Sequence, residues 1–233
     1  MFQENKFNTN ACGDCLKKCE PFLHLSEKEL NYINNNRYEA KFRAGETIFK
    51  QGSPTSHIIS FSYGLAKMYI EVHKQRDVVM SIVQPTSLIG GPGVYIDGRH
   101  KYSLSALTDS LVCFIDIHAF KKLVRTNSKF AELMIRDISM KDLRLMQRLV
   151  NVTVKQTQGR IAEILLYLSN TIFESDKFDI LLSRQEIADM TGMSKEGAIR
   201  ILKEFQKEKL IKCDAQIITV LDKKKLFEIS EIG

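Results

Sequence analysis

Three cysteines lie close together near the N-terminus, at a spacing suited to thiolate chemistry. Cys12, Cys15 and Cys19 fall within eight positions, in the segment CGDCLKKCEPF. Thiolates bind zinc and other soft metals, and neighbouring cysteines can instead form a redox-active disulfide. Cys113 lies in a hydrophobic run, where a free cysteine is commonly buried as a small apolar side chain. Cys213 takes part in none of these interpretations. For the other four cysteines, a metal site, a disulfide and a structural role all remain open at this point.

A second group of residues, near the C-terminus, has the spacing of a helix-turn-helix. Ser183 and Glu186 predict a capping box that opens a helix over SRQEIADMTG, and Gly192 is placed to end that helix. Ser194 is placed to cap a second helix, KEGAIRILKEFQKE. Small or apolar residues stand where the two helices must approach each other, namely Ile187, Ala188, Met193, Ala198 and Ile201. Two short β-like runs, at 211–213 and 216–221, then predict a wing.

The long segment that precedes this motif predicts one continuous helix over 128–155. No Pro or Gly interrupts it, and Ser128 is a candidate N-cap. A heptad seam, typical of two helices that pack along a shared stripe, follows one face and comprises Ile135, Ile138, Asp142, Leu145, Leu149 and Val152. A second apolar line follows another face and comprises Met140, Leu143, Met146 and Val150. The pattern therefore predicts a long central helix that carries a dimer interface along one face.

The region from Tyr38 to about Ile117 consists of short β-like runs separated by glycine, which favours an antiparallel roll or jelly roll. We therefore expect an α+β chain with four parts. They are an N-terminal cysteine-bearing segment (1–24), a β-roll sensor domain (25–127), a dimerisation helix (128–155) and a winged helix-turn-helix domain (156–233).

Composition excludes several classes of protein. The polar N-terminus lacks the apolar core of a signal peptide, and no apolar run approaches the roughly 20 residues of a membrane span. Five cysteines, an odd number, argue against a secreted disulfide framework. We therefore expect a cytoplasmic protein without a membrane partner. The formal net charge is +6, and residues 194–212 hold six Lys and Arg against three acidic residues, a local positive strip.

These motifs, in this order, resemble the CRP/FNR family of bacterial transcription regulators over nearly the whole chain. The resemblance is carried by FRAGETIFKQGSPTSHIISFSYGLAKMY, by the heptad helix and by SRQEIADMTGMSKEGAIRILKEFQ. It implies a homodimer whose subunits each have an effector-sensing roll like a cyclic-nucleotide-binding domain. It also implies double-stranded DNA with two-fold half-sites as a partner, and RNA polymerase as a further partner through the hairpin His73–Asp77.

In a helix-turn-helix the second helix enters the major groove with its N-terminal residues at base edges. Those residues here are Lys195, Glu196, Ile199 and Arg200, of which Glu196 and Arg200 match the family's base-reading pair. Ile199 departs from the family's usual residues, so the half-site is not predicted. A Glu196–Arg200 surface ion pair is the alternative interpretation. Candidates for phosphate contacts are Thr153, Lys155, Ser183, Arg184 and Lys203, and Ser194 is a further candidate DNA-binding residue.

The cysteine segments resemble those of the oxygen-sensing branch of the family. The resemblance implies that Cys12, Cys15, Cys19 and Cys113 hold a [4Fe–4S] cluster, although three residues separate Cys15 from Cys19 where that branch has five. Three alternatives to the cluster remain: zinc bound by the same cysteines, a disulfide switch, and haem bound through Met68, His73 or His100. The cyclic-AMP-binding carboxylate and Arg-Ser pair are replaced by Gly91, Lys101 and Tyr102, so we do not expect a cyclic nucleotide.

Two further expectations concern function. No P-loop, metalloprotease motif or Cys–His–Asp context is visible, so we expect a regulator and not an enzyme; a constitutive DNA binder is the remaining alternative. Asp142 interrupts the heptad seam, and two-fold symmetry would bring two such carboxylates together, which opposes association. We therefore expect Asp142 to weaken the dimer until the cofactor is bound.

Overall fold

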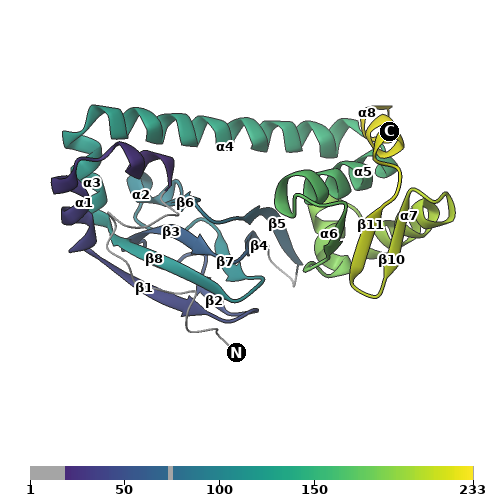
Figure 1. Cartoon of the computed structure of the whole chain (residues 1–233), viewed down its shortest axis with the longest axis horizontal. Coiled ribbons are helices and arrows are strands. Elements are labelled where there is room, and N and C mark those ends of the chain that lie inside the picture. The colour runs from purple at the N-terminus through teal and green to yellow at the C-terminus, as the bar shows by residue number, and fades with distance from the viewer. Residues whose placement is uncertain (1–18, 73–75, 233) are drawn as a thin grey trace. The chain divides into compact units, whose positions relative to one another are not determined.

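The computed structural model describes residues 19–72 and 76–232 (Figure 1). Cys12, Cys15 and His73 lie outside these residues. The described residues divide into two units, one ending at Lys141 and the other beginning at Asp142 and including residues 76–80. None of the described helices is long and apolar enough to cross a membrane.

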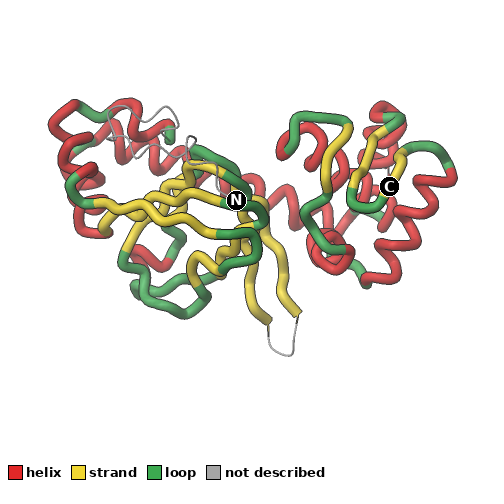
Figure 2. The backbone as a smooth tube through the Cα atoms, turned by 60° about the horizontal axis from the view of Figure 1, so that its bottom comes forward, coloured by secondary structure: helices red, strands yellow, loops and turns green. Residues whose placement is uncertain are grey.

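The first unit is a β-roll with short helices, as predicted. Two four-stranded antiparallel sheets have the orders β1-β8-β3-β6 and β2-β7-β4-β5, drawn as yellow tubes in Figure 2. The strands are β1 (Arg37–Phe42), β2 (Thr47–Phe49), β3 (His57–Tyr63), β4 (Ala66–Val72), β5 (Arg76–Val83), β6 (Leu88–Ile89), β7 (Ser103–Ala106) and β8 (Ser110–Asp116). The helices are a 3-10 turn (Glu20–His24), α1 (Glu27–Asn34), α2 (Gly93–Ile96) and α3 (Ile117–Thr126).

Strand β8 separates two hydrophobic cores because successive side chains on a strand point to opposite faces. Val112 and Phe114 face the core between the two sheets, where Phe61 is fully buried. Cys113 and Ile115 face the other core, which the helices cover and which contains Cys19 and Phe130. Cys113 is therefore buried on the helix-covered face of its sheet.

Helix α4 (Ser128–Val154) spans nearly the whole predicted range. Its N-cap is Asn127 and not Ser128 as expected: the Asn127 Oδ1 accepts a hydrogen bond from the Phe130 backbone N–H at 2.9 Å. Asn127 is the better placed residue because its backbone is still extended, whereas Ser128 is already helical. Only Phe130 and Leu133 of the helix are buried, so most of its apolar side chains are exposed.

The second unit contains the predicted helix-turn-helix and wing. Its elements are the end of α4, α5 (Thr157–Tyr167), a π-helical turn (Leu168–Ile172), β9 (Lys177–Asp179), α6 (Arg184–Thr191), α7 (Lys195–Lys207), β10 (Ile211–Asp214), β11 (Ile217–Val220) and α8 (Lys223–Ile232). The Ser183–Glu186 capping box is present, and Gly192 ends α6 with φ of 63°. The five residues predicted to pack the motif are all buried. The wing has β9 as a third strand, in the order β10-β11-β9.

Gly192 provides a test of the turn. A Cβ at this position would lie 2.8 Å from Val152 Cγ1, and the positive φ would also strain it. We expect Gly192→Ala to lower the free energy of unfolding by about 1–2 kcal/mol from the backbone alone, with a further loss from the clash. Gly98→Ala is the control, because Gly98 has φ of 68° and nothing within 4 Å of the added Cβ. Equal losses in urea unfolding of the two variants would show that the Val152 contact has no effect.

Candidate nucleic-acid interface and cysteine site

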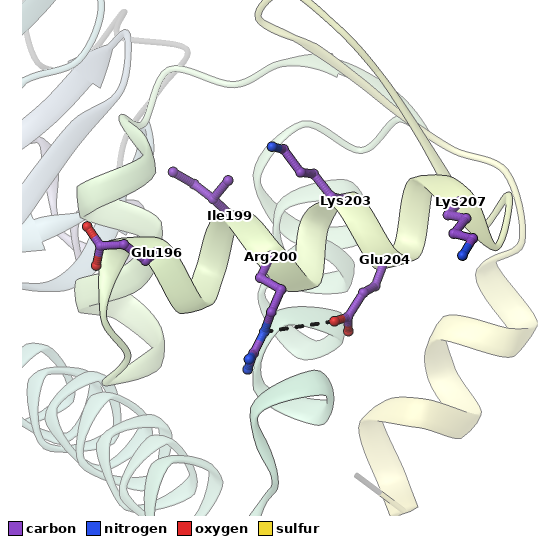
Figure 3. A pocket seen from close by; sticks show the side chains of 6 residues that line it. All are labelled: Glu196, Ile199, Arg200, Lys203, Glu204 and Lys207. Atoms are coloured by element: carbon purple, nitrogen blue, oxygen red, sulfur yellow. Dashed lines mark ion pairs between the residues drawn. The ribbon is translucent and has the colours of Figure 1, made fainter.

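The exposed side of α7 has the arrangement of a DNA-reading helix. The Ser194 hydroxyl caps it by accepting a hydrogen bond from the Gly197 backbone N–H at 3.1 Å. Ala198, Ile201, Leu202 and Phe205 are buried, which fixes the rotation of the helix about its axis. The opposite side lines a shallow surface pocket and carries Glu196, Ile199, Arg200, Lys203, Glu204 and Lys207 (Figure 3).

The predicted base-reading residues lie on this surface, and Arg200 pairs with Glu204 instead of with Glu196, the partner in the alternative interpretation. Its Nε lies 3.8 Å from the Glu204 carboxylate, as the dashed line in Figure 3 shows, and Glu196 points away. Glu204 is also held by the Gln158 side-chain amide at 3.3 Å, which gives Arg200 an anchored acceptor. Glu196 lies in the first turn of α7, where the helix dipole favours a negative charge without any side-chain partner.

Some of the candidate phosphate contacts already form hydrogen bonds or ion pairs within the chain. Lys203 is exposed beside Arg200. Lys155, in contrast, pairs with Glu163 at 2.6 Å, and the Thr153 hydroxyl donates to the Leu149 carbonyl of its own helix. Arg184 is half-buried, and its Nη1 has no hydrogen-bond partner among the described residues.

Two of the four predicted cysteine ligands converge on one position of the roll. The Cys19 Sγ lies 3.2 Å from the Ser60 hydroxyl, and Ser60 on β3 is the antiparallel partner of Cys113 on β8. Both thiols are buried and neither forms a disulfide. Among the described residues no group of three or more His, Cys, Asp and Glu side chains gathers as a metal site would require.

The surroundings of the Cys19 thiol disfavour free thiol reactivity. Burial raises the pKa of the Cys19 thiol to about 11, so the uncharged form prevails at neutral pH. A protonated, buried thiol is a poor nucleophile, whereas a bound soft cation would replace its proton. Cys19 and Cys113, two buried sulfur donors in one core cluster, have the donor chemistry of a thiolate-bound metal group.

The segment that carries Cys19 is joined to α4. Glu20, the next residue, forms an ion pair with Arg136 at 2.9 Å. The Lys141 ammonium donates to the Leu88 carbonyl at 2.7 Å and pairs with Asp137 at 2.6 Å. Leu88 is in turn the cross-strand partner of Ser60. Helix α4 thus contacts Glu20, which follows Cys19, and Leu88, which pairs with Ser60.

The positions that would hold a cyclic nucleotide are occupied by side chains of a different chemistry. The Tyr102 ring packs against Gly91, with its hydroxyl 2.9 Å from the place of a Gly91 Cβ. Lys101 pairs with Asp97. Of the candidate haem ligands, His100 stacks on Phe49 with 3.9 Å between ring centroids, and Met68 is half-buried beside the roll core.

Comparisons with known proteins agree with this architecture. Residues 39–127 match the model of the cyclic nucleotide-binding domain, and residues 159–229 match that of the Crp-like helix-turn-helix domain. The electron transport regulator A of Shewanella oneidensis is 25% identical over 91% of this chain and 86% of its own length. The fumarate and nitrate reduction regulatory protein of Vibrio cholerae is 24% identical over 95% of this chain and 91% of its own.

A solved structure supports the fold. FixK2 from Bradyrhizobium japonicum has a TM-score of 0.76 at 16% identity, covering 84% of this chain and 98% of the other. The roll, the long helix and the helix-turn-helix define a DNA-binding transcription regulator, not an enzyme. The chain belongs to the CRP/FNR family, as the sequence motifs predicted.

Sequence reasoning missed the residues that hold the predicted site residues, or their neighbours, in place through hydrogen bonds and ion pairs. Glu204 could have been found, because it stands four positions after Arg200, as Glu196 stands four before. Gln158, Arg136 and Lys141 could not, because their partners are remote in the sequence.

Arg200 and Lys203 should differ in how they contribute to DNA binding. An Arg that bonds bidentately to guanine reads one base pair, so Arg200→Ala should cost roughly 1–3 kcal/mol at that position and relax the preference there. Lys203→Ala should weaken binding to all sequences alike and reduce the salt slope by about one. Selection from a random half-site library, followed by binding titrations at several salt concentrations, measures both. An unchanged half-site preference in Arg200→Ala would contradict the assignment.

Proposed function

We propose that the protein is a homodimeric transcription regulator that responds to oxygen, redox state or nitric oxide through a [4Fe–4S] cluster on Cys12, Cys15, Cys19 and Cys113. DNA binding follows from the family, and the sensing is our inference. The observation that carries it is the convergence of the buried Cys19 and Cys113 thiols on Ser60, next to α4. The names of the two relatives, which refer to electron transport and to fumarate and nitrate reduction, support a redox signal.

A cluster bound by Cys19 and Cys113 together would act as a reversible cross-link between the N-terminal segment and the roll. With its ligands bound, Cys19 stays beside Ser60 and Glu20 stays beside Arg136 of α4. Release of Cys19 would remove that ion pair and uncover the core position that Cys19 fills. Because Arg136 stands between Ile135 and Ile138, the change would reach the proposed dimer seam directly.

The apolar side chains of the seam are exposed in the single chain, and a second subunit packed against them would bury them. Ile135, Ile138 and Leu149 are exposed to 66%, 61% and 65%, and full burial of such a side chain contributes roughly 1.5–3 kcal/mol. Leu145 is half exposed, whereas Val152 packs towards Gly192 within its own chain. The second line, Met140, Leu143, Met146 and Val150, is also exposed. Two-fold pairing through α4 would place the two α7 helices on successive half-sites.

The proposal also concerns a protein partner, RNA polymerase, and a competing metal, zinc. We retain RNA polymerase as a partner at the hairpin that ends at Asp77, on the family resemblance alone, since residues 73–75 lie outside those described. Zinc is the competing metal, because the short spacing between Cys15 and Cys19 also suits a four-thiolate zinc site. A zinc-holding protein would be a constitutive DNA binder.

Anaerobic purification tests the cofactor. We expect a coloured protein with about four iron and four sulfide per chain, whose absorbance fades in air together with its affinity for DNA. Cys19→Ser and Cys113→Ser should each reduce the iron content, whereas Cys213→Ser, a change in β10 of the wing, should not. A colourless protein with one zinc per chain, and equal DNA binding with and without oxygen, would refute the cluster and favour the constitutive alternative.

Asp142 tests the link between cofactor and dimer. Two carboxylates brought together at a two-fold axis oppose association, so Asp142→Ala should dimerise and bind DNA without a cofactor. Glu132→Ala is the matched control, since Glu132 is an exposed carboxylate of α4 off the seam, paired with Lys129. Sedimentation of the metal-free proteins gives the monomer–dimer equilibrium. No gain in dimer for Asp142→Ala, or an equal gain for Glu132→Ala, would remove this explanation.

A further inference from the structure

The helix-covered face of the β1-β8-β3 sheet carries a row of polar side chains that the sequence did not reveal. Cys113 on β8 is paired with Glu39 on β1 and with Ser60 on β3. Side chains at paired positions of antiparallel strands project to the same face. Glu39, Cys113 and Ser60 therefore lie side by side, with Cys19 against Ser60.

Arg37 joins this row from two residues earlier on β1. Its Nη1 donates to the Glu39 Oε1 at 2.6 Å and to the Cys113 Sγ at 3.6 Å, while its Nε donates to the Asn34 Oδ1 at 3.2 Å. The side chains of Arg37 and Glu39 are only 10% and 17% exposed. A carboxylate and an amide thus fix the guanidinium so that it offers an N–H to the cysteine sulfur.

A purely structural ion pair explains this arrangement poorly. Burying two charges costs about as much as their attraction returns, so a buried pair is a weak device for stability. The second carboxylate oxygen, Glu39 Oε2, is buried and has no hydrogen-bond partner among the described residues. Such an unsatisfied oxygen adds a further cost. What the arrangement does achieve is a fixed hydrogen-bond donor beside the sulfur.

We propose that Arg37, held by Glu39, is a positioning residue that supports the Cys113 thiolate as a metal ligand through an N–H···S hydrogen bond. The proposal rests on the proposed function, because it requires that the cysteines hold the cluster. Partners of metal ligands fix the orientation of those ligands, and hydrogen bonds to the sulfurs help to set the reduction potential of an iron–sulfur cluster. A donor stabilises the charge on the sulfur, so its loss makes the cluster easier to oxidise and its iron easier to remove.

The test compares four anaerobically purified proteins: wild type, Arg37→Met, Glu39→Gln and Lys41→Met. Lys41→Met is the matched control, because Lys41 is an exposed cation on the same strand. The measurements are iron and sulfide content, the rate of iron loss to a chelator, and the midpoint potential of the cluster. We expect iron loss from Arg37→Met to be about 10–100-fold faster than from wild type, with a lowered potential. Glu39→Gln should change both in the same direction but less, and Lys41→Met should match wild type.

The outcomes separate this inference from the proposed function. Wild-type protein without iron overturns both, whereas iron in wild type and unchanged loss and potential in Arg37→Met overturn the inference alone. An equal effect of Lys41→Met would also overturn it, since any nearby cation would then suffice. If Arg37→Met does not fold, Arg37→Lys replaces it, because lysine keeps the charge but loses the fork that reaches Glu39 and Cys113 together. Iron retention equal to wild type in Arg37→Lys would then contradict the proposal.

Discussion

The hydrogen bond between the Cys19 thiol and the Ser60 hydroxyl, together with the burial of Cys19 in the helix-covered core, holds the segment around Cys19 against the roll, and the sensing that we propose depends on this contact. It fixes Cys19 next to the strand that carries Cys113, and it keeps Glu20 within reach of Arg136. The bond is itself modest, since a neutral hydrogen bond contributes roughly 0.5–1.5 kcal/mol. A contact of that size is a reasonable basis for a switch, because a cofactor with several strong ligands can hold it and its loss can release it.

The DNA-reading side depends on a different constraint, which is local in the chain. The capping serines, Ser183 and Ser194, and the left-handed Gly192 set the two helices of the motif, and buried apolar residues fix the rotation of α7. Among the described residues, Gln158 gives the exposed side of α7 a long-range contact, at Glu204. The two sides can therefore be altered separately, so variants of the cysteine site should leave the choice of bases unchanged.

The same contrast explains how much could be predicted from the sequence. Caps, the turn glycine, the wing and the alternating strands follow from short patterns, and they led to the family and its fold. The N-cap prediction for α4 was wrong because two capping residues, Asn127 and Ser128, stand next to each other. The alternative interpretation of Arg200 likewise named Glu196, where the structure pairs Arg200 with Glu204. The Arg37–Cys113 contact could not be predicted, because it joins residues 76 positions apart and depends on the register of β1 against β8.

The proposed switch also limits how strong the dimer seam can be. A cofactor shifts an equilibrium only by its difference in affinity for the two states, and moving a population from 1:99 to 99:1 requires about 5.5 kcal/mol. A seam made entirely of aliphatic residues would hold the dimer together in either state and leave nothing to regulate. In the switch that we propose, a single carboxylate at Asp142, among side chains as exposed as Ile138 and Leu149, would keep association within the range that cofactor binding can shift. On this argument the charged residue in the seam is a requirement of regulation, and not a defect of packing.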